Sequence, residues 1–300
     1  MPWLQAHVLG DAAGAPLIEL LLESLGALSV TITDAGDEPI LEPAPGDTRL
    51  WRETRVTGLF DANVDREQLY SAISQALGQD VGERLKLETL ADQDWARAWL
   101  DRFEPMRFGD RLWIRPSGFQ VDDPEAVIVD LDPGLAFGTG THPTTSLCLR
   151  WLDQHDIRGL SVIDFGCGSG ILGIAALKLG ARSVVAIDHD PQALQASADN
   201  AERNQCRALL DIRHSTDELP PPADLVVANI LASTLIELRD SIGPLVKPGG
   251  NLLLSGILDT QADAVASAYA RDFDFAPPAG ESDWVMLHAT RRDQQDLLTP

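Results

Sequence analysis

The stretch SVIDFGCGSGILGIAAL, residues 161–177, joins an apolar strand to a helix through a turn of alternating glycines. The strand ends near Asp164, and Gly166, Gly168 and Gly170 follow it. Glycine adopts positive φ at no steric cost, and it lets a ligand approach the backbone because it has no Cβ. Ligands of open α/β sheets bind at the carboxyl ends of the strands, where the strand order reverses. We therefore expect a small-molecule site at this turn.

The chain around this turn alternates apolar strands with helices. We expect strands at 126–132, 160–166, 183–190, 209–215, 223–231 and 249–257, and helices at 171–181, 191–205 and 232–246. The tail, 273–292, predicts two final strands that form an antiparallel edge pair. Nearly continuous apolar strands are typical of a parallel sheet that helices cover on both faces. The sequence thus predicts a doubly wound α/β domain over residues 116–295.

The first ninety residues read as two similar halves, each with the order strand, helix, strand. Their strands are expected at 3–10, 28–34, 50–60 and 84–90, and their helices at 15–27 and 65–78. This order is typical of a ferredoxin-like α+β sandwich, so we assign residues 1–92 to a small separate domain. Residues 93–115 are expected to be a helical linker, since Trp95 and Trp99 would stack on one helix face. Such a face packs against a neighbouring domain or, as the alternative, binds a peptide.

The composition restricts the partners and the location. A formal net charge of −23 disfavours binding to nucleic-acid phosphate and favours a basic partner, or merely keeps the protein soluble. Cys148, Cys167 and Cys206 lack metal-ligand spacing, so we expect reduced thiols and no metal. No apolar run approaches the ~20 residues of a membrane span, and the first residues lack the pattern of a signal peptide. We expect a cytoplasmic monomer that contacts neither nucleic acid nor membrane.

The glycine spacing and its neighbours indicate the class of ligand. The pattern is G-x-G-x-G rather than the G-x-G-x-x-G of dinucleotide sites, and Asp164 precedes it. A carboxylate there would repel a diphosphate but suits an ammonium group, which favours S-adenosylmethionine over a dinucleotide. Asp188, at the end of the next strand, is placed to accept hydrogen bonds from ribose hydroxyls. The alternative is Asp190, which precedes Pro191 and is better explained as a helix N-cap.

Asn229 follows the apolar strand of VVANILAS and is expected at its carboxyl end. Its amide can accept a hydrogen bond from an amine and donate one to an acceptor, although turn residue or helix cap is the simpler alternative. Ile230 and Leu231 follow, without the prolines and the aromatic residue that would stack a planar acceptor. This aliphatic lip suits a flexible alkyl amine.

One further stretch has the period of neither helix nor strand: LDPGLAFGTGTHPTT, residues 131–145. Together with VIDFGCGSGILGIAALKLGA, ANIL, the segment DWARAWLDRFEPMRFGDRLWI and the start MPWLQ, it resembles the bacterial methyltransferases that modify protein eleven of the large ribosomal subunit. The resemblance covers nearly the whole chain.

The resemblance implies a class I methyltransferase that uses S-adenosylmethionine. It further implies that the small N-terminal domain recognises the ribosomal protein, a basic substrate, and that the helical linker repositions this domain. Methyl groups would be added to lysine side chains and to the N-terminal α-amine. Carried over to this chain, the cofactor contacts fall on Thr145, Gly166, Asp188 and Asn229.

We expect the stretch 131–145 to cover the cofactor, with hydroxyl contacts from Thr141 and Thr145 and with Phe137 excluding water. His142 is a candidate general base, but it precedes Pro143 and is as readily explained by a role in shaping the loop. Asn229 is the candidate catalytic residue, because it would orient the attacking amine. The full set of expected cofactor-binding residues is Thr141, Thr145, Asp164, Gly166, Gly168, Asp188 and Asn229. The alternatives are a non-catalytic ribosome-assembly module, a dinucleotide oxidoreductase and an N-methyltransferase of another substrate.

Overall fold

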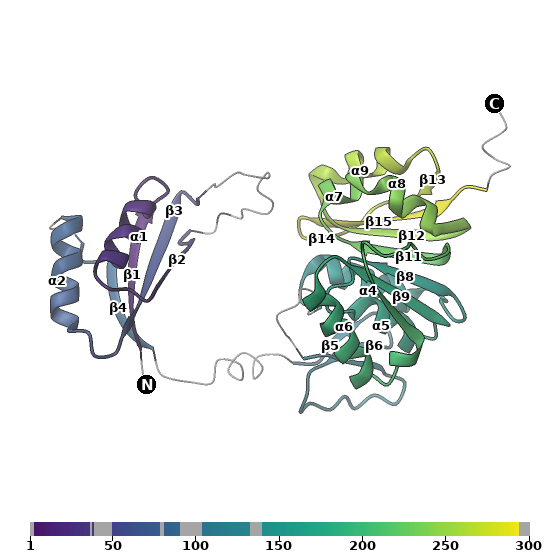
Figure 1. The fold of residues 1–300 in the computed structure, drawn as a ribbon, viewed down its shortest axis with the longest axis horizontal. Helices are drawn as coiled ribbons and strands as arrows, with labels where there is room; N and C mark the ends of the chain where they lie inside the picture. Colours follow the sequence, from purple (N-terminus) through teal and green to yellow (C-terminus); the bar gives the residue numbers. More distant parts are fainter. Residues whose placement is uncertain are drawn as a thin grey trace. The chain divides into compact units, whose positions relative to one another are not determined.

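The structure, a computed structural model, describes residues 3–36, 38, 50–78, 81–90, 104–132 and 140–293. The chain forms two compact units, Met1–Ala98 and Trp99–Pro300. Figure 1 shows the elements of each unit. No helix within the described ranges is both long and apolar enough to cross a membrane.

The first unit confirms the predicted ferredoxin-like sandwich. Its elements are β1 (Trp3–Asp11), α1 (Ala15–Ser24), β2 (Ser29–Asp34), β3 (Glu53–Asp61), α2 (Arg66–Leu77) and β4 (Leu85–Leu90). The sheet has the order β2-β3-β1-β4, and every neighbouring pair is antiparallel. Alternating residues of the strands and one face of each helix form its core, including Leu4, Val8, Ile18, Leu22, Val56, Phe60, Leu69 and Ile73. Asp65 caps α2 by accepting hydrogen bonds from two backbone N–H groups, as the predicted helix start requires.

The second unit is built on a mixed sheet with the order β10-β9-β8-β11-β12-β15-β13, and β14 pairs with β15. Its strands are β8 (Ser161–Phe165), β9 (Ser183–Asp188), β10 (Leu210–His214), β11 (Ala223–Asn229), β12 (Val246–Leu258), β13 (Phe273–Phe275), β14 (Ala279–Glu281) and β15 (Trp284–Arg291). The first five are parallel, whereas β15 is antiparallel to β12 and to β13. The order reverses between β8 and β11, which is where the fold class places a ligand.

Helices cover both faces of this sheet, as the apolar strands require (Figure 1). The core on one face includes residues of α4 (Pro143–Gln154), α5 (Ile171–Lys178) and α6 (Pro191–Arg203). The other face is covered by α7 (Ala232–Glu237), α8 (Arg239–Ile242) and α9 (Ala262–Tyr269). The described part of this unit also contains three short 3₁₀ turns: η2 (Arg207–Leu209), η3 (Gly243–Leu245) and η4 (Asp259–Gln261). All three cysteines are buried free thiols.

Three predictions about strands are wrong in detail. The strand predicted at 126–132, β7 (Val127–Asp130), joins a separate sheet with β5 (Met106–Phe108) and β6 (Leu112–Arg115). It has a single fully buried residue, Val129, so it does not need cover on both faces. Residues 106–115 therefore form strands where a helical linker was expected, and residues 93–103 lie outside the described ranges. The tail forms three strands, and its long strand β15 lies inside the sheet rather than at the edge, because its residues are mostly buried.

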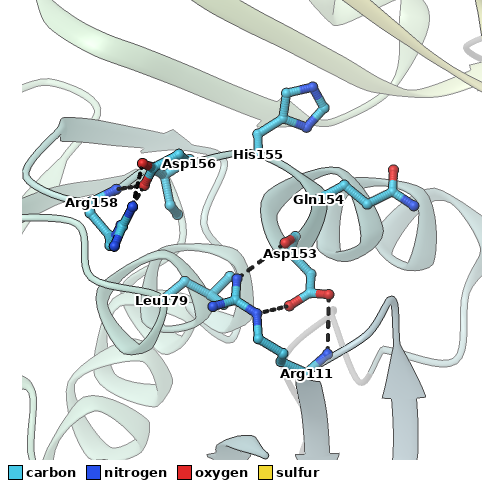
Figure 2. Close-up of a pocket in the computed structure, with 8 residues that line it drawn as sticks. Arg111, Asp153, Gln154, His155, Asp156, Arg158 and Leu179 are labelled. Carbon is cyan, nitrogen blue, oxygen red and sulfur yellow. Dashed lines mark hydrogen bonds and ion pairs between the residues drawn. The ribbon is translucent and has the colours of Figure 1, made fainter. Parts of the chain in front are cut away.

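Helix α4, like α9 and the strands β5 and β6, was not predicted from the sequence. Its last turn holds the small sheet in place, because Asp153 accepts hydrogen bonds from the backbone N–H groups of Asp110 at 2.5 Å and Arg111 at 3.2 Å. The Arg111 guanidinium lies 3.5 Å from the same carboxylate. Figure 2 shows this contact in the hollow at the C-terminal end of α4. The N-terminal end of the same helix enters the candidate site.

Candidate functional site

The predicted site residues meet at the carboxyl ends of the central strands. Phe165 pairs with Ile187 of β9 on one side and with Ala228 of β11 on the other. Asp188 and Asn229 each follow these partners by one residue, so they flank the turn that begins at Gly166. The register therefore brings the acid, the glycine turn and the amide to one edge of the sheet, at the point where the strand order reverses.

The glycine turn has the backbone conformation that its sequence predicts. Gly166, Gly168 and Gly170 have φ values of +76°, +54° and +77°, a region that favours glycine. A Cβ on Gly166 would lie 2.3 Å from Cγ2 of Ile230. The N–H groups of Gly166 and Cys167 donate to the Ile187 carbonyl at 2.8 and 3.0 Å. These contacts hold the backbone of the turn against the ends of β9 and β11, with no space for a larger residue at 166.

Asp188 is the acid that faces the glycine turn. It is 8% exposed, and its Oδ2 accepts a hydrogen bond from Gly168 N at 2.9 Å. Its Oδ1 accepts from the backbone N–H groups of His189 and Asp190 at 2.8 and 3.0 Å. Asp190 caps α6 by accepting from Gln192 N at 2.9 Å, which confirms the interpretation of Asp190 as a cap. A carboxylate oxygen can accept two hydrogen bonds, so Oδ2 retains capacity for a hydroxyl donor.

Asp164 is more deeply buried than its predicted role requires. It is 1% exposed, and its Oδ2 accepts from Gly173 N of α5 at 2.8 Å. The pKa of this carboxyl is raised from 3.8 to about 7, chiefly because burial disfavours the charged form; the Gly173 hydrogen bond lowers the pKa in part, and the nearby Asp188 charge adds to the rise. Asp164 therefore anchors the glycine turn to α5 and changes its charge near neutral pH.

Asn229 is held in one orientation by Thr145. The Asn229 Nδ2 donates to the Thr145 hydroxyl at 3.2 Å, across 84 residues of sequence. The Oδ1 of Asn229 is buried and, among the described residues, has no hydrogen-bond partner. A buried acceptor without a donor costs about 1–3 kcal/mol. This oxygen therefore retains the capacity to accept a hydrogen bond from an N–H group.

The stretch 131–145 is only partly a loop. Residues 133–139, which include Phe137, lie outside the described ranges. Pro143 begins α4, and Thr145 is 1% exposed in its first turn. The stretch was expected to have the period of neither helix nor strand, and its C-terminal end is instead helical, since proline is favoured at the first helical position. Thr141 is exposed and precedes the helix.

His142 caps α4. Its Nδ1 accepts a hydrogen bond from Thr144 N at 3.4 Å and lies 2.7 Å from the Thr144 hydroxyl. Its ring meets Trp284 edge to face, with the centroids 4.8 Å apart. Burial lowers the pKa of His142, so the imidazole is neutral at pH 7 and can act as the cap. The structure thus gives His142 the shaping role that the sequence offered as the alternative to catalysis.

Four contacts at the site involve residues that belong to no recognisable sequence motif. Ser255 donates to the Thr144 carbonyl at 3.1 Å, and Ser197 donates to the Gly168 carbonyl at 3.0 Å. A Cβ on Gly256 would lie 2.3 Å from the Ile230 carbonyl oxygen, and Trp284 packs on His142. Of these residues, Gly256 alone could have been identified from the sequence, because a glycine inside a strand often indicates that another backbone approaches closely.

The lip after β11 is aliphatic, as predicted. Ile230 lies between Gly166 and Gly256, whereas Leu231 is 52% exposed at the start of α7. Within the described ranges, no group of three His, Cys, Asp or Glu side chains could hold a metal ion. The donors and acceptors present are backbone amides, two carboxylates, hydroxyls and one free amide oxygen. This set fits an uncharged ribose, an ammonium group and an amine better than a diphosphate.

Comparisons with known proteins give one consistent result. The family model for Ribosomal protein L11 methyltransferase (PrmA) matches residues 2–292. The protein named Ribosomal protein L11 methyltransferase in Vibrio vulnificus (strain CMCP6) is 51% identical over 294 residues, which cover 97% of this chain and 100% of that protein. The protein of the same name in Aeromonas salmonicida (strain A449) is 52% identical over 288 residues, covering 96% and 98%.

A solved structure agrees with these matches. The crystal structure of ribosomal protein L11 methylase from Lactobacillus delbrueckii subsp. bulgaricus has a TM-score of 0.57 and 32% sequence identity to this chain. The match covers 64% of this chain and 100% of that one.

Proposed function

This chain belongs to the ribosomal protein L11 methyltransferase family, and from that premise we propose that it transfers methyl groups from S-adenosylmethionine to amines of ribosomal protein L11. The observation that carries this proposal is the unpartnered Oδ1 of Asn229 beside the glycine turn. It is the acceptor that an attacking amine needs, and Thr145 fixes it there.

The residues at the sheet edge fit the methyl donor. Asp188 would hold the ribose hydroxyls, and the backbone of Gly166 and Gly168 would lie against the ligand. The charge of Asp164, whose carboxyl is buried and accepts from Gly173 N, would favour the ammonium group of the ligand. Thr141, which precedes α4, would contact it from the other side, with Thr145. When bound, S-adenosylmethionine supplies a methyl group on a positively charged sulfur, which the lone pair of an amine can attack in line.

Asn229 would prepare the amine for this attack. A lysine ammonium has a pKa of ~10.4 in water and arrives protonated at neutral pH. Burial in the site lowers this pKa because it disfavours the charged form. The Asn229 Oδ1 then accepts one N–H of the neutral amine and so directs its lone pair. Orientation of this kind is where methyl transfer gains most of its rate.

The finer proposals concern substrate recognition. We propose that the modified groups are lysine side chains and the N-terminal α-amine, since the aliphatic lip at Ile230 and Leu231 accommodates a flexible chain. Residues 1–92 would recognise the substrate, and the residues before β5 would connect them to the catalytic domain, which includes β5 and β6. The reaction would take place in the cytoplasm. The net charge of −23 supports a basic substrate, because opposite charge accelerates association.

The test is intact-mass analysis of purified ribosomal protein L11 after incubation with the full chain and isotopically labelled S-adenosylmethionine. We expect labelled mass increments of whole methyl groups, and their loss with Asn229→Ala. Thr290→Val, a change at an exposed position of β15, is the matched control and should remain active. Binding of S-adenosylhomocysteine without any transfer would instead support the non-catalytic assembly role.

A further inference from the structure

A second cavity of about 420 Å³ lies in the catalytic unit, between the start of β5 and the loop that joins β6 to β7. Two aromatic side chains, Trp113 and Phe119, and three carboxylates, Glu104, Asp122 and Asp123, line it. Its described lining contains no basic residue. An aromatic wall combined with uncompensated negative charge is the chemistry that binds organic cations.

The strand pattern explains why Trp113, which is half-buried, lies on the opposite face of β6 from the core. In β6, Leu112 and Ile114 are buried in the core, so Trp113 lies on the opposite face of the strand. Arg107 pairs with Trp113 across β5 and β6, and its guanidinium carbon lies 5.9 Å from the centroid of the indole ring. The ring therefore already binds one cation of the chain itself. Phe119 is 37% exposed, which leaves its ring available to a ligand.

The carboxylates of this cavity differ from those of the hollow in Figure 2. There, Asp153 and Asp156 pair with Arg111 and Arg158, so their charge is already compensated. By contrast, Glu104, Asp122 and Asp123 form no ion pair with any basic side chain in the described part of the chain. The same residues make no metal site, because no three ligating side chains converge among the described residues.

The cavity lies close to the segment that enters the transfer site. A Cβ on Gly140 would lie 3.4 Å from Cε of Met106, and Met106 directly follows Pro105, which lines the cavity. Gly140 in turn precedes Thr141 and the His142 cap. The start of β5, which borders the cavity, therefore lies beside the residues that lead into α4.

We propose that this cavity binds a cationic side chain, lysine or arginine, of the protein substrate at a position outside the transfer site. The inference rests on the proposed function for the identity of the substrate. A protein that binds ribosomal RNA carries many lysines and arginines, since these neutralise phosphate. The cavity holds one of them while another amine is methylated, and so it aligns the substrate.

The first experiment measures steady-state methylation of ribosomal protein L11 by the full chain. The double variant Asp122→Asn/Asp123→Asn keeps the side-chain shapes, including the contact of Asp123 with Glu125 N, but removes two charges. We expect KM to rise about three- to tenfold with kcat unchanged, and KM to depend less on salt. Phe119→Ala should raise KM without a change in salt dependence.

The matched control removes two exposed charges from α6, as Asp199→Asn/Glu202→Gln, and should leave KM within about twofold. An equal rise of KM in the control would overturn the proposal, since it would show a general effect of net charge. A fall in kcat with constant KM would also overturn it.

The second experiment does not need turnover. Nitrogen-15 NMR would follow the Trp113 indole N–H, assigned with Trp113→Phe, during titration with N-acetyl-lysine amide, N-acetyl-arginine amide and uncharged N-acetyl-norleucine amide. Saturable shifts with the cations alone, lost in Asp122→Asn/Asp123→Asn, support the cavity, and the stronger cation identifies the residue it takes. The absence of saturable shifts with either cation, or equal shifts with norleucine amide, contradicts it. If L11 is methylated but neither KM nor the NMR shifts change as expected, only this inference fails. If the cations bind in the cavity but L11 is not methylated, only the proposed function fails.

Discussion

The charge of Asp164 gives a quantitative test of the proposed donor site. Burial raises the pKa of this carboxyl to about 7, so lowering the pH from 7.0 to 5.5 reduces its ionised fraction from about one half to about 3%. If the ionised carboxylate attracts the ammonium group of the ligand, its contribution to ligand affinity is full above pH 7. This contribution is lost as the pH falls below the pKa of Asp164. The expected loss over this interval is about tenfold. The α-amine of the ligand, with a pKa near ~8, stays mostly protonated throughout.

Titration calorimetry with S-adenosylhomocysteine at pH 5.5, 6.0, 6.5 and 7.0 measures this dependence. Measurement in two buffers with different heats of ionisation counts the protons released on binding. We expect nearly one proton at pH 5.5, since the ammonium keeps Asp164 ionised in the complex. Asp164→Asn should bind with an affinity that is constant over the interval.

His142 is the main competitor for this effect, because its imidazole also titrates near this range and its pKa is lowered by burial. His142→Asn should therefore retain the pH dependence. A flat wild-type profile, or a slope that survives in Asp164→Asn and disappears in His142→Asn, would refute the assignment of Asp164 to the ammonium group.

Substitutions at three positions test the rest of the site. Asn229→Ala should lower kcat by about 10²–10³-fold, because the amine loses its acceptor; full turnover in a labelled-methyl assay would contradict the orienting role. Thr145→Val removes the hydroxyl 3.2 Å from Asn229 Nδ2 and should lower kcat about fivefold. Thr145→Ser keeps this hydroxyl and should have the wild-type kcat. Equal rates for both variants would show that Thr145 acts through packing alone. Gly166→Ala combines a positive φ with a Cβ 2.3 Å from Ile230 and should destabilise the unit by about 2–3 kcal/mol. An unchanged melting temperature and retained S-adenosylhomocysteine binding would show that the turn can relax.

The edge of the sheet was predictable because parallel strands end together. Once the strands leading to Asp164, Asp188 and Asn229 were identified, the rule for open α/β sheets placed these residues near one another. The ferredoxin-like unit was predictable for a similar reason, since its strands alternate clearly and Asp65 marks a helix start. In both cases a local pattern determines the long-range arrangement.

Other features depend on contacts that no local pattern records. The four residues of β7 are too few to show which sheet they join, and that choice follows from pairing with β6. The first turn of α4 has the composition of a loop, and its threonines are buried by Asn229 and Ser255, which lie 84 and 111 residues away. The direction of the Asp164 carboxyl, toward Gly173 rather than toward solvent, likewise follows from helix packing.

The inserted position of β15 has a consequence for biosynthesis. β15 lies between β12 and β13 in the sheet but is synthesised after both of them. The edges of β12 and β13 that pair with β15 therefore stay unpaired until β15 has been made. Ser146 must likewise wait for Glu281, its hydrogen-bond partner 135 residues later. While it is still attached to the ribosome, the nascent chain therefore holds an unfinished sheet with exposed strand edges, which is the kind of intermediate that depends on chaperones. An enzyme proposed to modify a ribosomal protein thus completes its sheet only after β15, which ends at Arg291, has been synthesised.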